Sequence, residues 1–225
     1  MRNAIRRTLC VFVLSLVAVC GAQAQSQAVP GDIKAFGAQY VAALNSKDAA
    51  RLLALQHPKS LACMTPENKD FYDWTMAMQM RESIPANYML SAMPPNENNL
   101  KALESMGEQW PIKPAQEIHI DYQQGDDSGS VVVWLVRENG RWLGDFPCAT
   151  DAAIKEFHDG AAARKAAEAR YKALADGIKE PLRSELLAML RAHETGRATD
   201  RYHAATGHDE RTSMLVINAL KDETR

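Results

Sequence analysis

The residues that most directly suggest chemistry are the methionines, because seven of the nine that follow residue 24 fall between positions 64 and 106. Thioether sulfur is a soft ligand that suits cuprous copper, and Met76, Met78 and Met80 stand at alternate positions. On a helix, alternate side chains point about 200° apart, so these three cannot share a face. Methionine is also an adaptable filler of cores and apolar pockets, and we favour this interpretation. The methionines therefore predict no metal site.

Two cysteines, Cys63 and Cys148, follow the first 24 residues. They could form a disulfide, remain as separate buried thiols, or supply a nucleophile. No histidine flanks either one in a recognisable catalytic arrangement. The first 24 residues are typical of an export signal, and an exported chain meets an oxidising compartment, which favours the disulfide. The bond would close a loop of 85 residues and stabilise the fold by about 4 kcal/mol on the loop-entropy model.

The histidines form no strong metal-binding pattern. His193 and Glu194 begin like a zincin motif, but Arg197 stands where the second histidine would be. His119 and Asp121 would share one face of a strand, either as a polar pair in a cavity or, as we favour, toward solvent. Because the chain also lacks a Gly-rich phosphate loop and a nucleophile elbow, we expect no cofactor.

The first 24 residues are typical of a bacterial export signal. A basic start precedes an apolar run of 12 residues and a small-x-small cleavage site that ends at Ala24. The run is too short to span a bilayer, so we expect a periplasmic or secreted protein without a transmembrane segment. Lipid attachment at Cys20 is an alternative, which the bulky Val19 before it disfavours.

Composition narrows the class of protein. The chain is 46% hydrophobic and 24% charged, which is ordinary for a globular protein and excludes collagen-like and wholly disordered chains. Residues 25–225 carry 23 basic and 28 acidic side chains, a net charge of −5. A nucleic-acid-binding protein would show a basic excess, so nucleic acid is not an expected partner.

Hydrophobic periodicity predicts an α+β domain over residues 25–149. Apolar spacing indicates a helical hairpin over residues 32–57, with Asp32 and Asp48 as N-caps, and a third helix from Thr65 to about residue 82. A short strand over 88–93 and a short helix over 98–106 follow. Strict alternation predicts a strand over 117–122 that buries Ile118, Ile120 and Tyr122, and Asn139-Gly140 predicts a hairpin between strands 131–136 and 141–146.

Residues 150–225 predict an all-helical extension. This segment is rich in alanine and carries 13 basic and 13 acidic residues. A leucine stripe at positions 182, 186, 187 and 190 must be buried, either on the convex face of the α+β domain or in an interface with a protein partner or a second copy.

Two motifs resemble the nuclear transport factor two-like superfamily over about residues 32–148. The sequence from Tyr40 to Asp48 resembles its first helix, and that from Val133 to Trp142 resembles its last two strands. The resemblance implies a cone fold, in which a helical hairpin and a third helix pack on a bent antiparallel sheet around a cavity for small apolar molecules. The resemblance concerns the fold alone and does not indicate a reaction.

The superfamily includes the ketosteroid isomerases, whose catalytic residues can be compared with this sequence. There a first-helix tyrosine donates a hydrogen bond to the developing oxyanion, and Tyr40 matches that position. The carboxylate base of the family falls on Met64 in this chain, and the nearest acid is Glu67. Enolisation needs a positioned proton acceptor, so the resemblance does not imply isomerase activity for this chain. Asp121 is a candidate for the second, protonated acid.

These observations favour an exported, non-catalytic protein of the bacterial envelope that binds a small ligand or acts as an accessory protein. The residues expected to line its pocket are aromatic or apolar: Trp74, Met78, Tyr88 and Trp134. One alternative is an isomerase, hydratase or cyclase that uses Tyr40 on a small apolar substrate. Another is an interaction module that captures a protein partner, or a second copy, through residues 150–225.

Overall fold

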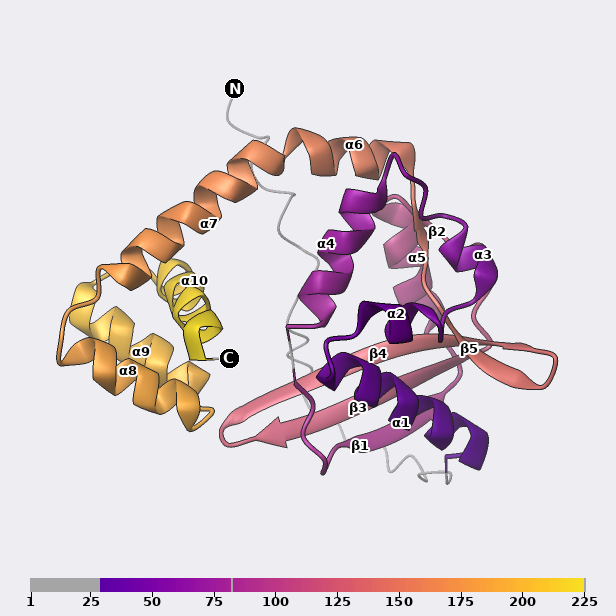
Figure 1. The fold of residues 1–225 in the computed structure, drawn as a ribbon, viewed down its shortest axis with the longest axis horizontal. Coiled ribbons are helices and arrows are strands. Elements are labelled where there is room, and N and C mark those ends of the chain that lie inside the picture. Colours follow the sequence, from indigo (N-terminus) through magenta and orange to yellow (C-terminus); the bar gives the residue numbers. More distant parts are fainter. Residues whose placement is uncertain (1–28, 82, 225) are drawn as a thin grey trace.

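We describe a computed structural model of the chain over residues 29–81 and 83–224. It is a mixed α and β structure, with an antiparallel sheet followed by helices, as the sequence predicts. The export signal and Cys20 lie outside the described residues. No helix within these ranges is both long enough and apolar enough to cross a membrane. Figure 1 shows the sheet and its helices on one side and the carboxyl-terminal helices on the other.

The main sheet has four antiparallel strands in the order β1-β3-β4-β5. Their bounds are β1 Met89–Met93, β3 Gln116–Gln124, β4 Asp127–Glu138 and β5 Arg141–Asp145. The turn between β4 and β5 is the predicted one, since Asn139 and Gly140 both have positive φ, at 50° and 79°, which a two-residue hairpin turn requires. A two-stranded sheet joins β2 Glu108–Gln109 to β6 Cys148–Ala149.

One face of the main sheet carries the first hydrophobic core. Helix α1, Gly31–Asn45, contributes Ile33, Phe36 and Tyr40 to it. Ile118 and Ile120 of β3 are fully buried in the same cluster, as their alternation predicts. A Cβ atom at Gly37 would lie only 2.2 Å from Leu90 of β1, so glycine lets α1 approach the sheet closely. We call this cluster the sheet core.

The remaining helices of the α+β part are short. They are α2 Ala49–Leu53, α3 Pro58–Leu61, α4 Lys69–Gln79 and α5 Glu97–Ser105. Asp48 caps α2 as predicted, accepting from the backbone N–H of Arg51 at 3.1 Å. The prediction for Asp32 is wrong, because Pro30 stands at the N-cap of α1. Asp32 accepts instead from the Trp142 indole at 2.9 Å, which ties the first turn of α1 to β5.

Two helices lead away from the sheet. Helix α6, Asp151–Asp159, and helix α7, Ala161–Asp176, meet at Gly160. The Arg164 guanidinium lies over the Phe157 ring, 4.0 Å from its centroid, and donates to the Phe157 carbonyl at 2.6 Å. Phe157 packs edge-on against Phe71 of α4 at 5.3 Å, which anchors the root of this arm on the α+β part.

The carboxyl-terminal helices build a second hydrophobic core. Helices α8 Leu182–Arg191, α9 Thr195–Thr206 and α10 Glu210–Lys221 pack with the end of α7, and the short 3-10 helix η1, Asp222–Thr224, follows. We call α7 to α10 the helical array. The leucine stripe does not pack on the sheet: Leu186 and Leu190 are buried among Tyr202, Val216, Ile217 and Leu220 of the array itself.

The array meets the sheet again at the tip of the β3–β4 hairpin, as Figure 1 shows. The backbone N–H groups of Asp126 and Asp127 both donate to the carbonyl of His193, at 3.1 and 3.0 Å. The Asp127 carboxylate accepts from the backbone N–H of Thr195 at 2.9 Å and from its hydroxyl at 2.5 Å. Lys221 Nζ lies 3.3 Å from the same carboxylate. We call this contact the hairpin junction.

Candidate functional site

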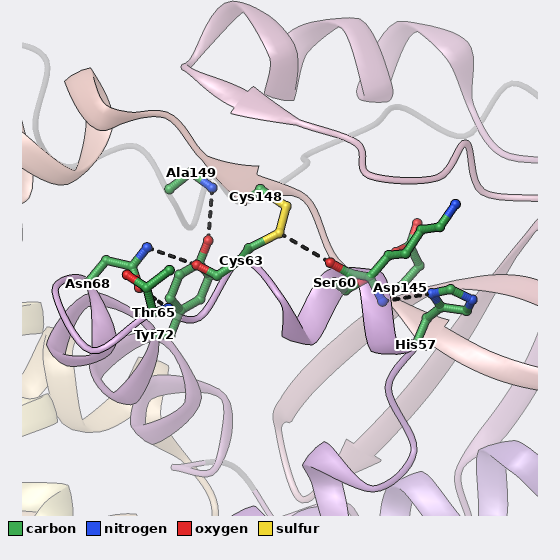
Figure 2. The surroundings of a disulfide bond; sticks show 10 residues. His57, Ser60, Cys63, Thr65, Asn68, Tyr72, Asp145, Cys148 and Ala149 are labelled. Carbon is green, nitrogen blue, oxygen red and sulfur yellow. Dashed lines mark hydrogen bonds between the residues drawn. A yellow bond between two sulfur atoms is a disulfide. The ribbon is translucent and has the colours of Figure 1, made fainter.

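The predicted disulfide between Cys63 and Cys148 is present, with 5.6 Å between the Cα atoms. Cys63 follows α3 and Cys148 lies in β6. Figure 2 shows Tyr72 of α4 beside the bond, where its hydroxyl oxygen accepts from the backbone N–H of Ala149 at 3.1 Å. Because β6 leads directly into α6, the disulfide fixes the point where the arm leaves the α+β part.

A serine, a histidine and an acid lie beside the disulfide, a set that could in principle form a nucleophilic site (Figure 2). The Ser60 hydroxyl donates directly to the Asp145 carboxylate, and both side chains are buried. His57 Nδ1 accepts from the backbone N–H of Lys59 at 3.1 Å, and Nε2 lies 3.3 Å from Glu138. Both ring nitrogens are therefore engaged away from Ser60, so His57 is not placed to act as the general base for this serine. The Ser60–Asp145 hydrogen bond holds α3 against β5.

Asp145 is nevertheless an unusual carboxylate. Its side chain is only 3% exposed, and burial raises its pKa, while the Ser60 hydrogen bond and the charge of His57 act in the opposite direction. Its second oxygen Oδ2 has no hydrogen-bond partner among the described residues, and neither has the indole N–H of Trp134, which stands opposite it on β4.

Tyr40 is placed in the sheet core. Its side chain is 4% exposed and its ring stacks on that of Phe36, with 6.1 Å between centroids. Burial raises the pKa of the hydroxyl above its ordinary value, which keeps it neutral. Glu67, the acid nearest to the expected base position, lies exposed in the turn before α4. The structure therefore brings no acid of that segment into the sheet core with Tyr40.

Asp121 lies on the opposite face of the sheet from the sheet core, together with His119. Both are half-buried, and the His119 side chain is 24% exposed. Sequence reasoning missed Glu117, which shares this face, is fully buried and accepts from His119 and from the backbone N–H of Asn96. The signal was present in the alternation of residues 117, 119 and 121, because a buried glutamate needs a partner and the nearest is the histidine two residues on.

The four residues expected to line a pocket lie in separate places. Tyr88, just before β1, packs against the sheet core. Trp134 lies on the other face of the sheet, edge-on to Trp110 at 5.1 Å. Trp74 packs on Phe157 of α6 at 5.5 Å, and Met78 lies half-buried one helical turn later on α4. The structure thus brings Trp74 and Met78 together on one helix and separates them from the other two.

Two hollows of the described part of the chain lie elsewhere. The larger of the two has a volume of about 480 Å³ and lies between the end of α7, the loop 177–181, the start of α8 and α9; we call it the array hollow. The smaller, about 300 Å³, lies at the hairpin junction and is lined by Asp127, Thr195 and Lys221 among others. No group of three or more His, Cys, Asp or Glu side chains that could hold a metal ion occurs in residues 29–81 and 83–224.

Glu108 of β2 titrates near neutrality. Its side chain is half-buried opposite Ala149, and this burial raises its pKa from 4.5 to about 7. A carboxyl whose pKa is raised by folding contributes stability that is complete below about pH 4.5 and is lost as the pH rises through 7.

We therefore expect Glu108→Gln to raise the free energy of unfolding at pH 8 by about 1–2 kcal/mol, after allowance for partial solvent screening, and to change it little at pH 4.5. Urea midpoints measured from pH 4.5 to 8 would show the difference, with Glu104→Gln on the exposed surface of α5 as the matched control. A constant difference between Glu108→Gln and wild type across this pH range would contradict the assignment.

Comparison of the chain with protein-family models, with curated proteins and with solved structures found no match.

Proposed function

We propose that this chain is an exported, non-catalytic binding protein of the bacterial envelope that holds a small apolar molecule in the array hollow. The observation that carries the proposal is the hollow itself, whose volume of about 480 Å³ lies within the range of small-molecule sites. On this view the α+β part is a cone-type scaffold of the nuclear transport factor two-like kind, and the helical array carries the site.

The composition of the array hollow suits an apolar molecule with one polar end. Leu174, Ile178, Leu182 and Tyr202 contribute apolar surface to its lining. Lys179, Thr206 and His208 contribute polar groups, and of these the Thr206 hydroxyl already donates to the Tyr202 carbonyl at 2.8 Å. Glu180 also lines the hollow, but its carboxylate accepts from the hydroxyl and from the backbone N–H of Ser184, and these two hydrogen bonds lower its pKa and keep it engaged at the start of α8. An apolar anion would place its charge toward Lys179.

Two further observations support the remaining parts of the proposal. The Cys63–Cys148 disulfide is of the kind that persists in oxidising compartments, which agrees with the export signal in the sequence. The stacking of Tyr40 on Phe36 within an apolar cluster supports a scaffold role for that tyrosine over a catalytic one.

The test uses the apolar anion 8-anilinonaphthalene-1-sulfonate as a fluorescent probe. Ala173 lines the array hollow, and Ala166 lies exposed on α7 two helical turns earlier, outside it. We expect Ala173→Phe to weaken probe binding by at least about tenfold, because the ring fills part of the hollow, and Ala166→Phe to leave it unchanged.

Circular dichroism would establish that both variants keep their helices. Equal binding by wild type and both variants would place the probe elsewhere and remove the array hollow as the site. Native mass spectrometry of the protein purified from a bacterial periplasm would then report whether any small molecule is retained.

A further inference from the structure

The two edge strands of the main sheet, β5 and β1, differ in what lies beside them. Beyond β5, residues 55–57 lie along the edge, where Leu55 accepts from the Gly144 N–H at 2.8 Å and His57 donates to the Gly144 carbonyl at 2.8 Å. Beyond β1, none of the described residues forms a backbone hydrogen bond with the outer edge. Within residues 29–81 and 83–224, strand β1 therefore leaves backbone donors and acceptors unpaired along its outer edge.

Strand β1 also lacks the features that normally protect such an edge. Natural edge strands carry charged residues, prolines or bulges that prevent pairing with another chain. The five residues of β1, Met-Leu-Ser-Ala-Met, include no charge and no proline, and the nearest prolines lie outside the strand, at positions 85, 94 and 95. Met89 is 71% exposed and Met93 is 40% exposed, so both ends of the strand offer apolar side chains.

The strand is complementary to itself. A twofold axis through Ser91 would place Met89 opposite the partner's Met93 and Leu90 opposite the partner's Ala92 in an antiparallel ladder. Because successive side chains of a strand alternate between faces, the methionine pairs would lie on one face and the leucine–alanine pairs on the other. The two Ser91 residues would face each other at the axis, and no like charges would meet.

We propose that β1 pairs with β1 of a second copy of this chain, which joins the two four-stranded sheets into one of eight strands. The arrangement is a closed twofold dimer, in which each copy uses the same surface. It is independent of the array hollow, and it places the second copy on the sheet edge instead of on residues 150–225. A strand from an unrelated protein would lack the matched register, so the observations favour the second copy.

The first test measures mass in solution by light scattering after gel filtration, over a dilution series. We expect wild type to be a dimer, and Ser91→Lys and Ser91→Glu each to be monomers, because like charges would meet at the axis. Mixing the two variants should restore the dimer, since the introduced lysine of one copy would then face the introduced glutamate of the other. Ser130→Lys, on the exposed surface of the central strand β4, should remain a dimer.

The second test needs no variant and so does not depend on how Ser91 substitutions fold. Four methionines of the described part of the chain are exposed: Met89, Met93, Met106 (52%) and Met214 (40%). In the dimer we expect hydrogen peroxide to oxidise Met89 and Met93 at least about fivefold more slowly than Met106 and Met214, because the pairing covers the first two only. A monomer at every concentration, a dimer that survives Ser91→Lys, or equal oxidation of all four methionines would overturn the proposal.

Discussion

Replacing both Cys63 and Cys148 by serine should lower the free energy of unfolding by about 4 kcal/mol and the Tm by about 10 °C. The disulfide closes a loop of 85 residues, and losing it frees that loop in the unfolded chain. In the folded chain it also ties the end of α3 to β6, so local opening at the root of α6 should become easier. Thermal melts of the double variant, and of wild type with and without a reductant, measure the effect.

The comparison with reduced wild type separates the covalent bond from the serine side chains. Both cysteines are half-buried, so serine hydroxyls can be accommodated without burying an unsatisfied polar group. We expect reduced wild type and the double variant to melt together, below the oxidised protein. A reductant that leaves the Tm unchanged would show that the bond contributes nothing.

The second large effect is expected at the hairpin junction, where Asp127→Ala should detach the helical array from the sheet. The carboxylate accepts two hydrogen bonds from Thr195 and lies beside Lys221, and the Asp127 and Lys221 side chains are each only 22% exposed. Hydrogen bonds to a charged group contribute about 1.5–3 kcal/mol each, and the substitution leaves the backbone N–H of Thr195, the first residue of α9, without this acceptor. We expect the array to be destabilised by about 3 kcal/mol.

The distribution of tryptophan makes this measurable. All four tryptophans precede residue 150, so their fluorescence reports on the α+β part, whereas far-ultraviolet circular dichroism is dominated by helices and includes the array. In Asp127→Ala the helical signal should be lost at lower urea than the tryptophan signal, and the radius of gyration from small-angle scattering should increase.

Asp126→Ala is the matched control for the hairpin junction, because Asp126 is exposed and joins the contact through its backbone N–H alone. It should behave as wild type. If Asp127→Ala also unfolds with coincident transitions at the wild-type midpoint, the junction does not hold the array.

The parts of the fold that the sequence predicted well are those set by local chemistry. The β4–β5 hairpin follows from Asn139-Gly140, a pair that can adopt two positive φ angles in succession at little cost. The burial of Ile118 and Ile120 follows from strict alternation. Asp48 caps the helix that follows it because the carboxylate and the N–H group that it accepts from lie within one turn.

What the sequence did not predict depends on contacts between distant residues. The leucine stripe had to be buried, but periodicity says nothing of the surface it meets, which is Tyr202 and α10 of the same array. Asp127 is the first residue of β4, directly after the turn at residues 125–126, and its role arises only from Thr195, 68 residues later. The resemblance at Tyr40 rests on sequence alone, whereas the surroundings of its side chain depend on how closely α1 lies on the sheet at Gly37.

Helices α6 and α7 form an arm that links the aromatic contacts of α6 to the hairpin junction. Near its start, Arg164 lies over Phe157, and Phe157 packs on Phe71. Its other end, the end of α7, packs in the helical array, which contacts the sheet at the hairpin junction. Helix α7 has 16 residues and is therefore about 24 Å long. A rotation of about 5° at the root would move the far end of such a lever by about 2 Å, which is enough to break a hydrogen bond. The aromatic packing at one end of the molecule therefore sets the alignment of the Asp127 contacts at the other, although the two share no residue.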